Sequence, residues 1–469
     1  MPAPPTPGGS AGPLDALRAE SAVGRTLPRG RVLTQIALEV RRFLWLVDVF
    51  GAAFSMLLAH ALSPVFLAGP GAREALDAAA VYAAAFVFVG YAVGLYEWNV
   101  GLPRLTLLFR LLVSSALSAV ATLGFFYLVF YRPIGRFVMA YTVLLSAPLS
   151  FVPRYALWLV LRQRRQRVLF AGGGALADQL AAIIESRSEA LYEVVGHWRP
   201  GAGEELLQVC RSKGVDEIVL PTGAAELEPV LVHALHCLPL GCRLRSEADF
   251  HEDLVSAVAV MHVPPAWMLA KGLDTSNHLA EAVKRLTDIA LASTLLVVSA
   301  PLNLLAMVAL ALQGGPVFYS QVRVGRHGRP FWILKLRTMR VDAEEGPAQW
   351  ARPDDGRATP VGRFLRRTRI DELPQLLNIL FGEMSFVGPR PERPEFVEEL
   401  EKAIPFYSWR HVVRPGLTGW AQINYPYGSS VEDARRKLEY DLYYIRHYSV
   451  LTDLSIALRT VTAALRGAR

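Results

Sequence analysis

Two adjacent carboxylates, Asp371 and Glu372, introduce a short apolar stretch that runs to Asn378. Such a pair followed by Pro374 often serves only the helix dipole at a helix start. Here the number of nearby guanidinium groups exceeds what a solvated surface needs, which favours a carboxylate that works on a phosphate. The neighbouring arginines are Arg363, Arg366, Arg367, Arg369, Arg390 and Arg393.

Three further stretches carry cations or hydrogen-bonding groups, two of them on glycine-proline turns. They are Lys335-Leu336-Arg337-Thr338-Met339, Gly388-Pro389-Arg390-Pro391-Glu392 and Arg414-Pro415-Gly416-Leu417-Thr418-Gly419-Trp420-Ala421-Gln422. Because such turns fix the backbone, they can hold cations around phosphate oxygens. Candidate phosphate-binding residues are Lys335, Arg337, Arg366 and Arg390, of which Arg337 could equally pair with an acidic helix.

The composition lies between that of a soluble enzyme and that of a polytopic transporter. The chain has 469 residues, a mean hydropathy of +0.28 and 19% charged residues, so part of it must meet lipid. The net charge of +7 suits anionic phosphates or an anionic membrane surface as well as nucleic acid. The 3 cysteines form no CxxC pair, which predicts a reduced, cytosolic setting for the region around them.

Four apolar stretches are each long enough to span a bilayer, at about 43–62, 75–95, 107–130 and 137–161. Arginines precede the first stretch at Arg41 and Arg42, and a basic block, 162–167, follows the fourth. The positive-inside rule therefore places both ends in the cytoplasm, although Arg132 and Arg136 weakly oppose this orientation. The residues before the first span are rich in Pro, Gly and Ala and predict a disordered tail over 1–35, not a signal peptide.

Strands alternate with helical stretches after the basic block. Predicted strands at 167–171, 193–198 and 215–220 indicate a Rossmann-like α/β domain with a mostly parallel sheet. Gly172 and Gly174 lie in the first turn and could cradle a pyrophosphate. Trp198 and Arg199 stand where an acidic ribose partner is expected, so a packing turn is the alternative.

A fifth apolar stretch, about 286–312, has basic residues on both sides. A full crossing would export the arginines that follow it. A helix broken at Pro301 that enters one leaflet and returns would keep them inside. We predict this re-entrant form, with a full fifth span as the alternative, and expect Lys284, Arg285 and Asp288 to fix the helix at the interface.

The region from Lys284 to Arg466 resembles a known family. It carries, in order, the basic-Asp entry to a proline-broken membrane helix, KLRTM, DELPQLLN, GPRPE, RPGLTGWAQ and YDLYYIRHYS. This order is similar to that of the bacterial polyprenyl-phosphate sugar-phosphate transferases, which initiate exopolysaccharide and O-antigen assembly. The four spans and the α/β domain resemble the large, membrane-elaborated members. This chain has Ala300 where members often have Ser before the proline, so a polar bond at the break is not expected.

The resemblance implies an activity: transfer of a sugar 1-phosphate from a UDP-sugar to polyprenyl phosphate, with release of UMP. It implies that Asp371 is the nucleophile and that Glu372 helps to hold Mg²⁺. Arg390 would then bind phosphate or nucleotide, with Arg366 and Lys335 as further anion contacts. The expected location is the bacterial inner membrane, with the catalytic domain on the cytoplasmic face.

We therefore expect a membrane protein of four parts: a disordered tail, four transmembrane helices over 36–165, the Rossmann-like α/β domain over 166–275, and a monotopic, α-rich catalytic domain over 280–469. Expected partners are a UDP-sugar, polyprenyl phosphate and the lipid bilayer, with room for a homo-oligomer and no nucleic acid. The alternatives are a membrane-anchored nucleotide-binding sensor, which leaves Asp371 unexplained, and a nucleotide-sugar-modifying dehydratase. The dehydratase would need a Tyr-x-x-x-Lys pair, which the chain lacks.

Overall fold

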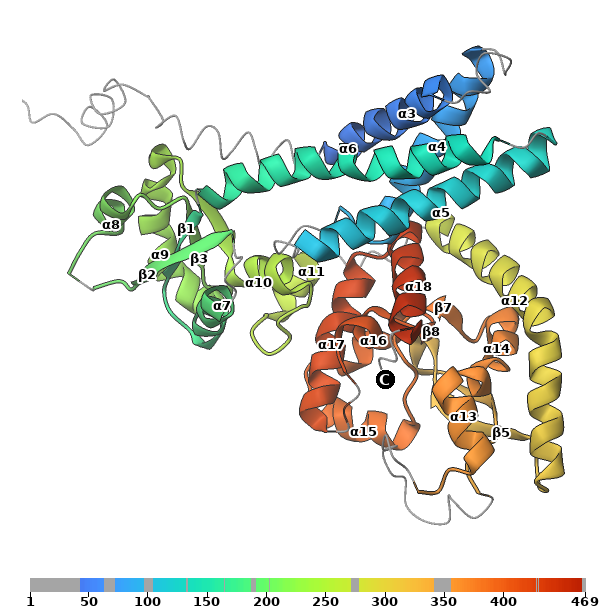
Figure 1. Cartoon of the computed structure of the whole chain (residues 1–469). Coiled ribbons are helices and arrows are strands. Elements are labelled where there is room, and N and C mark those ends of the chain that lie inside the picture. Colours follow the sequence, from blue (N-terminus) through green and yellow to red (C-terminus); the bar gives the residue numbers. More distant parts are fainter. Residues whose placement is uncertain are drawn as a thin grey trace, which may run out of the picture.

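Figure 1 shows the computed structural model of the chain. It describes residues 43–62, 72–96, 104–131, 134–163, 165–186, 191–201, 203–270, 278–340, 356–426, 428 and 430–465. The predicted tail over 1–35 and the arginines Arg41, Arg42 and Arg132 lie outside the described residues.

The N-terminal part is a bundle of four long apolar helices that coincide with the predicted stretches. Each helix packs against the next, and the first also packs against the last, which closes the bundle. All four are long and apolar enough to cross a membrane. They are α3 (Leu44–Leu62), α4 (Ala72–Ala92), α5 (Arg104–Phe130) and α6 (Arg136–Gln163).

A buried ion pair links the first and last helices of this bundle. The guanidinium of Arg154 on α6 donates to both carboxylate oxygens of Asp48 on α3, at 2.6 Å each. The hydroxyl of Tyr96, which follows α4, donates to the same carboxylate at 2.6 Å. Charges in an apolar bundle are costly unless paired, so this bidentate contact satisfies both ions at once.

A four-stranded parallel sheet with helices on both faces follows the bundle. Its strand order is β2-β1-β3-β4, and α7 and α10 cover one face while α8 and α9 cover the other. The predicted parallel sheet is confirmed. The strands are β1 (Gln166–Ala171), β2 (Tyr192–Trp198), β3 (Glu217–Leu220) and β4 (Arg243–Ser246); the helices are α7 (Ala175–Ser186), α8 (Leu206–Lys213), α9 (Ala224–His236) and α10 (Glu247–Val255).

The segment after α10 packs into the C-terminal part of the chain. Val258 and Met268 belong to the same buried cluster as Leu438 and Leu442, and helix α11 (Pro265–Ala270) lies in this segment. An ion pair of 2.6 Å between the buried Glu252 on α10 and Arg446 adds a polar contact. The segment that follows the sheet therefore shares a core with the C-terminal part.

The C-terminal part is mostly helical and contains two small sheets, the antiparallel pair β5-β6 and the parallel pair β7-β8. Its strands are β5 (Phe318–Val324), β6 (Pro330–Leu336), β7 (Ser385–Val387) and β8 (Gly416–Thr418). Its helices are α12 (His278–Leu312), α13 (Pro360–Thr368), α14 (Gln375–Phe381), α15 (Pro394–Ala403), α16 (Trp420–Asn424), α17 (Val431–Arg446) and α18 (Val450–Leu465). Short 3-10 turns are η2 (Leu238–Leu240), η3 (Arg326–Gly328), η4 (Ile370–Glu372) and η5 (Tyr407–Val412).

Among the described residues, helix α12 is the fifth helix that is long and apolar enough to cross a membrane, and only 11% of its most apolar stretch is buried. The helix continues through Pro301 and is bent, with its two halves running in different directions (Figure 1). The predicted break is therefore a bend in a continuous helix, because proline removes one hydrogen bond without unwinding its neighbours. Glu281 near its start pairs with Arg326, and Leu310 near its end packs on Leu336, so both ends contact the same folded body.

Helix α18 contacts both the bundle and the C-terminal body (Figure 1). The Thr460 hydroxyl hydrogen-bonds to that of Thr418 on β8 at 2.6 Å. The guanidinium of Arg459 lies 5.3 Å from the ring centroid of Trp420, and a Cβ at Gly94, just after α4, would lie 2.0 Å from Arg459 Nη2. Arg459 thus sits between the bundle and the RPGLTGWAQ segment.

Candidate active site

The Asp-Glu pair lies at a junction between two helices. Helix α13 ends at Thr368 and is capped by Arg369, whose φ of 59° is left-handed, and η4 carries Ile370, Asp371 and Glu372 before α14 begins. Ile370 packs into a core cluster with Leu336. This packing fixes the turn, and both carboxylates are buried, with 7% and 8% of their surface exposed.

Three cations surround one oxygen of Glu372. Oε1 lies 3.0 Å from Lys335 Nζ, 3.1 Å from Arg390 Nη2 and 3.6 Å from Arg369 Nη1. Burial alone would raise the pKa of Glu372, but the three cations hold it well below its usual range. Glu372 is therefore ionised and neutralised by its neighbours.

Asp371 has the opposite electrostatic balance. Burial raises its pKa to about 6, Glu372 adds to the rise, and Lys335, Arg369 and Arg366 oppose it. Its Oδ1 is buried and has no hydrogen-bond partner within the described part of the chain. Asp371 is thus a carboxylate whose oxygen is not committed to the protein itself.

Lys335 is held in place by the helix that follows the carboxylates. Asn378 on α14 accepts from the Leu334 amide at 3.1 Å and donates to the Trp332 carbonyl at 2.7 Å, as a neighbouring strand would. These bonds fix β6, which carries Lys335, against α14. Burial lowers the pKa of Lys335, and Glu372 is the largest opposing influence.

Arg390 lies in the turn that follows β7. The Gly388 amide donates to the Thr418 carbonyl at 2.9 Å, which joins this turn to the RPGLTGWAQ segment. A Cβ at Gly388 would lie 2.3 Å from the Arg414 carbonyl oxygen, so only glycine permits this approach. Three of the predicted site motifs therefore meet at the Glu372 carboxylate and the turn behind it.

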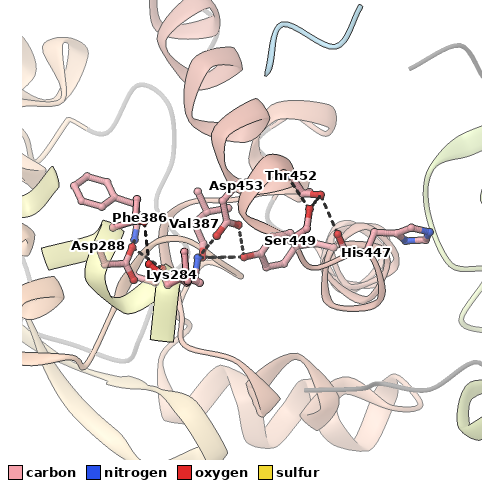
Figure 2. A network of polar contacts seen from close by, with 12 residues as sticks. Lys284, Asp288, Phe386, Val387, His447, Ser449, Thr452 and Asp453 are labelled. Carbon is pink, nitrogen blue, oxygen red and sulfur yellow. Dashed lines mark hydrogen bonds and ion pairs between the residues drawn. The ribbon is translucent and has the colours of Figure 1, made fainter. Parts of the chain in front are cut away.

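Lys284 and Asp288 fix α12 to β7, as Figure 2 shows. Lys284 Nζ donates to the Val387 carbonyl at 3.0 Å and to Asp453 Oδ2 on α18 at 2.5 Å. Asp288 Oδ1 accepts from the Phe386 amide at 3.1 Å. These buried bonds connect the apolar helix to the strand that leads directly into the Arg390 turn.

Arg285 contacts a different element. Its guanidinium donates to the Ile379 and Leu380 carbonyls at 2.5 and 2.7 Å, at the C-terminal end of α14. Helix C-termini leave carbonyls without partners inside the helix, and a cation satisfies them and the helix dipole together. Lys284, Arg285 and Asp288 thus attach α12 to α14, which follows the carboxylates, and to β7, which leads into the Arg390 turn.

The remaining predicted residues lie outside this cluster or act at longer range. Arg366 influences the pKa of Asp371, although no direct contact between their side chains is among the described ones. The buried Arg337 donates to the Gly314 carbonyl just after α12, so the structure gives it a partner that is neither Glu372 nor an acidic helix. Pro301 lies inside α12, away from the carboxylates in sequence.

The glycine turn after β1 lies in the parallel-sheet region. Gly172 and Gly173 have φ values of 110° and 83°, and a Cβ at Gly173 would lie 2.6 Å from Arg199 Nε. A Cβ at Gly174 would lie 4.0 Å from Glu226 Oε2. Side chains of the protein itself therefore approach the positions predicted to contact a pyrophosphate.

Several residues of the site were not predicted from sequence. The most important are Asn378, Arg410, Asp441 and Asp453. Asn378 closes the DELPQLLN motif, and a polar residue at the end of an apolar run could have indicated its role. Asp453 lies 169 residues from its partner Lys284, and no local pattern indicates such a contact.

Comparisons with known proteins match this arrangement to a family. The sequence profile described as bacterial sugar transferase matches residues 279–467. The chain is 43% identical over 316 residues to the UDP-glucose:undecaprenyl-phosphate glucose-1-phosphate transferase of Escherichia coli (strain K12), covering 63% of this chain and 67% of that protein. The chain belongs to the bacterial sugar transferase family. The predicted family is thereby confirmed.

The names of two other bacterial sugar transferases specify different sugars, N-acetylgalactosamine in one and glucose in the other. The chain is 44% identical over 186 residues to the UDP-N-acetylgalactosamine-undecaprenyl-phosphate N-acetylgalactosaminephosphotransferase of Aeromonas hydrophila, covering 39% of this chain and 44% of that protein. It is 37% identical over 272 residues to the UDP-glucose:undecaprenyl-phosphate glucose-1-phosphate transferase of Xanthomonas campestris pv. campestris, covering 56% of each. The chain thus spans about half the length of these two relatives.

Proposed function

We propose that this chain transfers a sugar 1-phosphate from a UDP-sugar to polyprenyl phosphate and releases UMP. The observation that carries the proposal is the carboxylate pair: Asp371 has a buried, uncommitted oxygen, and the adjacent Glu372 gathers three cations. The names of the family members support the same reaction class. A sensor that only binds a nucleotide would have no use for this arrangement.

The chemistry proposed for Asp371 has two in-line steps. In the first, a carboxylate oxygen of Asp371 attacks the phosphorus that bears the sugar, and the bond from that phosphorus to the bridging oxygen breaks. UMP leaves with the bridging oxygen, and a sugar-phosphoryl aspartate remains. In the second, an oxygen of polyprenyl phosphate attacks the same phosphorus, and Asp371 departs as a carboxylate.

The cations around Glu372 would stabilise the charge that moves in both steps. Lys335 and Arg390 are close enough to Glu372 to be hydrogen-bonded to it, and they need little rearrangement to reach phosphate oxygens beside Asp371. Glu372 would then act as the group that holds these cations before substrate arrives. This division of roles follows from the opposite pKa shifts of the two carboxyls.

The residues present are compatible with Mg²⁺ bound mainly through substrate. Mg²⁺ commonly uses one or two protein carboxylates and completes its shell with phosphate oxygens and water. No group of three or more acidic, His or Cys side chains suited to a metal occurs in the described residues, but Glu372 and Asp371 supply two carboxylates. Glu372 would hold the ion, which would neutralise diphosphate oxygens as the bond to UMP breaks.

The same proposal includes a location at the cytoplasmic face of the bacterial inner membrane. Both ends of α12 contact one folded body, through Glu281 and Arg326 at the start and Leu310 and Leu336 at the end. This supports a re-entrant helix whose apolar surface enters one leaflet, and a monotopic catalytic domain. Such a placement would bring Asp371 to the level at which a lipid phosphate meets a soluble nucleotide sugar.

For the Rossmann-like domain we favour a structural attachment over a nucleotide site. Arg199 and Glu226 approach the turn at Gly173 and Gly174, where a pyrophosphate would need open backbone amides. The carboxylate of Glu226 would repel an anion there, and the guanidinium of Arg199 would attract one, so charge does not decide the question. The close approach of the side chains supports the packing-turn alternative.

UMP release tests the proposed function. The full chain, purified in lipid nanodiscs, is incubated with undecaprenyl phosphate and Mg²⁺ and with UDP-glucose, UDP-galactose or their N-acetylated forms. We expect one or more of these sugars to yield UMP, and Asp371→Asn to abolish release while the protein still inserts. Wild-type turnover in that variant would exclude the nucleophile assignment.

A labelling experiment isolates the first step. With a UDP-sugar radiolabelled in the sugar and no lipid acceptor, the wild type should retain label through denaturation and release it when hydroxylamine cleaves the acyl phosphate. Asp371→Asn should retain none. No protein-bound label under these conditions, together with UMP release only after undecaprenyl phosphate is added, would favour direct transfer between the two substrates.

A further inference from the structure

The turn that carries Arg390 is held through its carbonyl oxygens. Pro389 and Pro391 have no N–H, so at these two positions the backbone cannot donate a hydrogen bond that would fix the segment. Instead, each carbonyl from 389 to 392 has a donor. The four donors are the Gly416 amide at 2.9 Å, Arg410 Nη2 at 3.0 Å, Arg323 Nη1 at 3.3 Å and the Val324 amide at 3.0 Å.

Arg410 donates the hydrogen bond to the carbonyl of Arg390, whose side chain reaches Glu372. Its Nη2 donates to the Arg390 carbonyl at 3.0 Å and lies 2.8 Å from Asp441 Oδ2 on α17. Its Nη1 donates to the Tyr407 hydroxyl at 2.6 Å. Arg410 and Asp441 are both buried, whereas the side chain of Arg390 points to Glu372 and is partly exposed.

The geometry assigns to Arg410, oriented by Asp441, a positioning role: it fixes the backbone of Arg390 so that the Arg390 guanidinium reaches Glu372 and the substrate diphosphate. This inference rests on the function proposed above. A guanidinium on a long side chain can be aimed only if its own backbone is fixed, and the prolines on either side leave the carbonyl as the point of attachment.

A purely structural role explains this pair less well. Replacing a buried ion pair by well-packed apolar side chains is often neutral or stabilising, so the pair contributes little that apolar residues could not. Apolar side chains could not donate a hydrogen bond to the Arg390 carbonyl. Arg410 does so, and Asp441 balances its charge. Asp441 is the group that neutralises Arg410 and fixes the direction of its planar fork.

A double-mutant cycle with Arg390 separates positioning from stability. Arg410→Lys and Asp441→Asn are made in the wild type and in Arg390→Ala, all as full chains in nanodiscs. KM for the UDP-sugar and kcat are measured by UMP release, and Kd for UDP is measured by titration calorimetry. We expect each single variant to raise KM and the Kd for UDP roughly ten-fold, as for the loss of one charge-assisted hydrogen bond. In Arg390→Ala the same changes should have no further effect.

The control is a second buried ion pair on α17, the helix that carries Asp441, and this second pair does not contact the Arg390 turn. Arg446 on α17 pairs with Glu252 at 2.6 Å, and both side chains are buried. Arg446→Lys should lower the melting temperature and leave the Kd for UDP unchanged. If Arg410→Lys behaved like Arg446→Lys, or if its effects multiplied with those of Arg390→Ala, the positioning role would be wrong.

The UDP titration keeps this inference separate from the proposed reaction. If the wild type released no UMP from any UDP-sugar, the proposed function would fail. A dependence of UDP affinity on Arg410 that vanishes in Arg390→Ala would still support positioning of an anion-binding arginine. Equal UDP affinity in all of the variants would overturn it, whatever the result of the UMP assay.

Discussion

Asp371 and Glu372 are adjacent in the chain, yet their surroundings move their pKa values in opposite directions. Glu372 faces Lys335, Arg369 and Arg390, whereas Asp371 keeps a buried oxygen without a hydrogen-bond partner in the described residues. The folded protein therefore stabilises the ionised form of Glu372 and destabilises the ionised form of Asp371. Several expectations follow from this difference.

Asp371→Asn should make the protein more stable as well as inactive. Burial raises the Asp371 pKa from 3.8 to about 6, so ionisation of this group costs the folded state up to about 3 kcal/mol above pH 6. Folding binds extra protons between pH 4 and 6, so wild-type stability falls as pH rises through this window. Thermal unfolding at pH 8 should show a higher melting temperature for the variant, and the gain should shrink towards pH 4. A lower melting temperature at pH 8 would contradict this account.

The pH dependence of turnover should report the same group. A nucleophilic Asp371 must be ionised, so kcat/KM for the UDP-sugar should fall as pH drops below about 6, well above the 3.8 of an ordinary Asp. The measurement is initial rate of UMP release from pH 4.5 to 8.5. If kcat/KM fell only near pH 4, substrate or a cation would have to remove the effect of burial on the Asp371 pKa.

Glu372→Gln should destabilise the protein, in contrast to the change at its neighbour. It would leave the partly buried Lys335 without its counter-ion, at a cost of roughly 1–3 kcal/mol. The comparison is Glu395→Gln, which removes an exposed carboxylate 3.5 Å from Arg393 and should change stability by less than about 1 kcal/mol. Melting temperatures of the two variants in nanodiscs at pH 7.5 provide the test. Similar small shifts in both would show that the cations do not depend on Glu372.

The sequence indicated the carboxylate pair and its cations but not how they are attached. Asp371 and Glu372 were candidates because a carboxylate pair among several arginines is unusual, whereas Lys335 and Arg390 were candidates through the KLRTM and GPRPE motifs. The donor to the Arg390 carbonyl was not predictable, because any side chain from a distant helix could supply it. For Arg337 the residue type allowed several partners, and only tertiary packing selected the Gly314 carbonyl.

The apolar helices were the easiest elements to predict, since a run of about 20 apolar residues has few other uses. The stretch predicted at 107–130 is a helix over Arg104–Phe130, and that at 137–161 is a helix over Arg136–Gln163. The break at Pro301 is instead a bend, because the helix on either side retains enough hydrogen bonds to continue.

Arg285→Ala should destabilise α14 and, through α14, the site. The change leaves the Ile379 and Leu380 carbonyls without their side-chain donor at the end of α14, a loss of about 1–3 kcal/mol. Since α14 follows Glu372, UMP release should fall together with melting temperature. Arg329→Ala, an exposed position in the same region, is the control and should alter neither by much. Unchanged stability in Arg285→Ala would show that water replaces the guanidinium.

Gly94→Ala should disturb the contact between the bundle and α18. Gly94 and Gly314 both have a φ of 76°, so alanine costs about 1 kcal/mol of backbone strain at either position. Only at Gly94 would the new Cβ meet Arg459, at 2.0 Å, whereas nothing lies within 4 Å at Gly314. Limited proteolysis and melting temperature should therefore change more for Gly94→Ala than for Gly314→Ala. Equal effects would indicate that Arg459 moves aside freely.

The pair formed by Asp48 and Arg154 also concerns how the protein is made. These partners are 106 residues apart, so α3 emerges from the ribosome long before α6 does. Until then Asp48 has no cation to neutralise it in apolar surroundings, and Arg154 in turn cannot rest in the bundle without Asp48. We therefore expect membrane insertion of the first and last helices of the bundle to be coupled, and a chain interrupted between them to leave an unpaired carboxylate on an apolar helix.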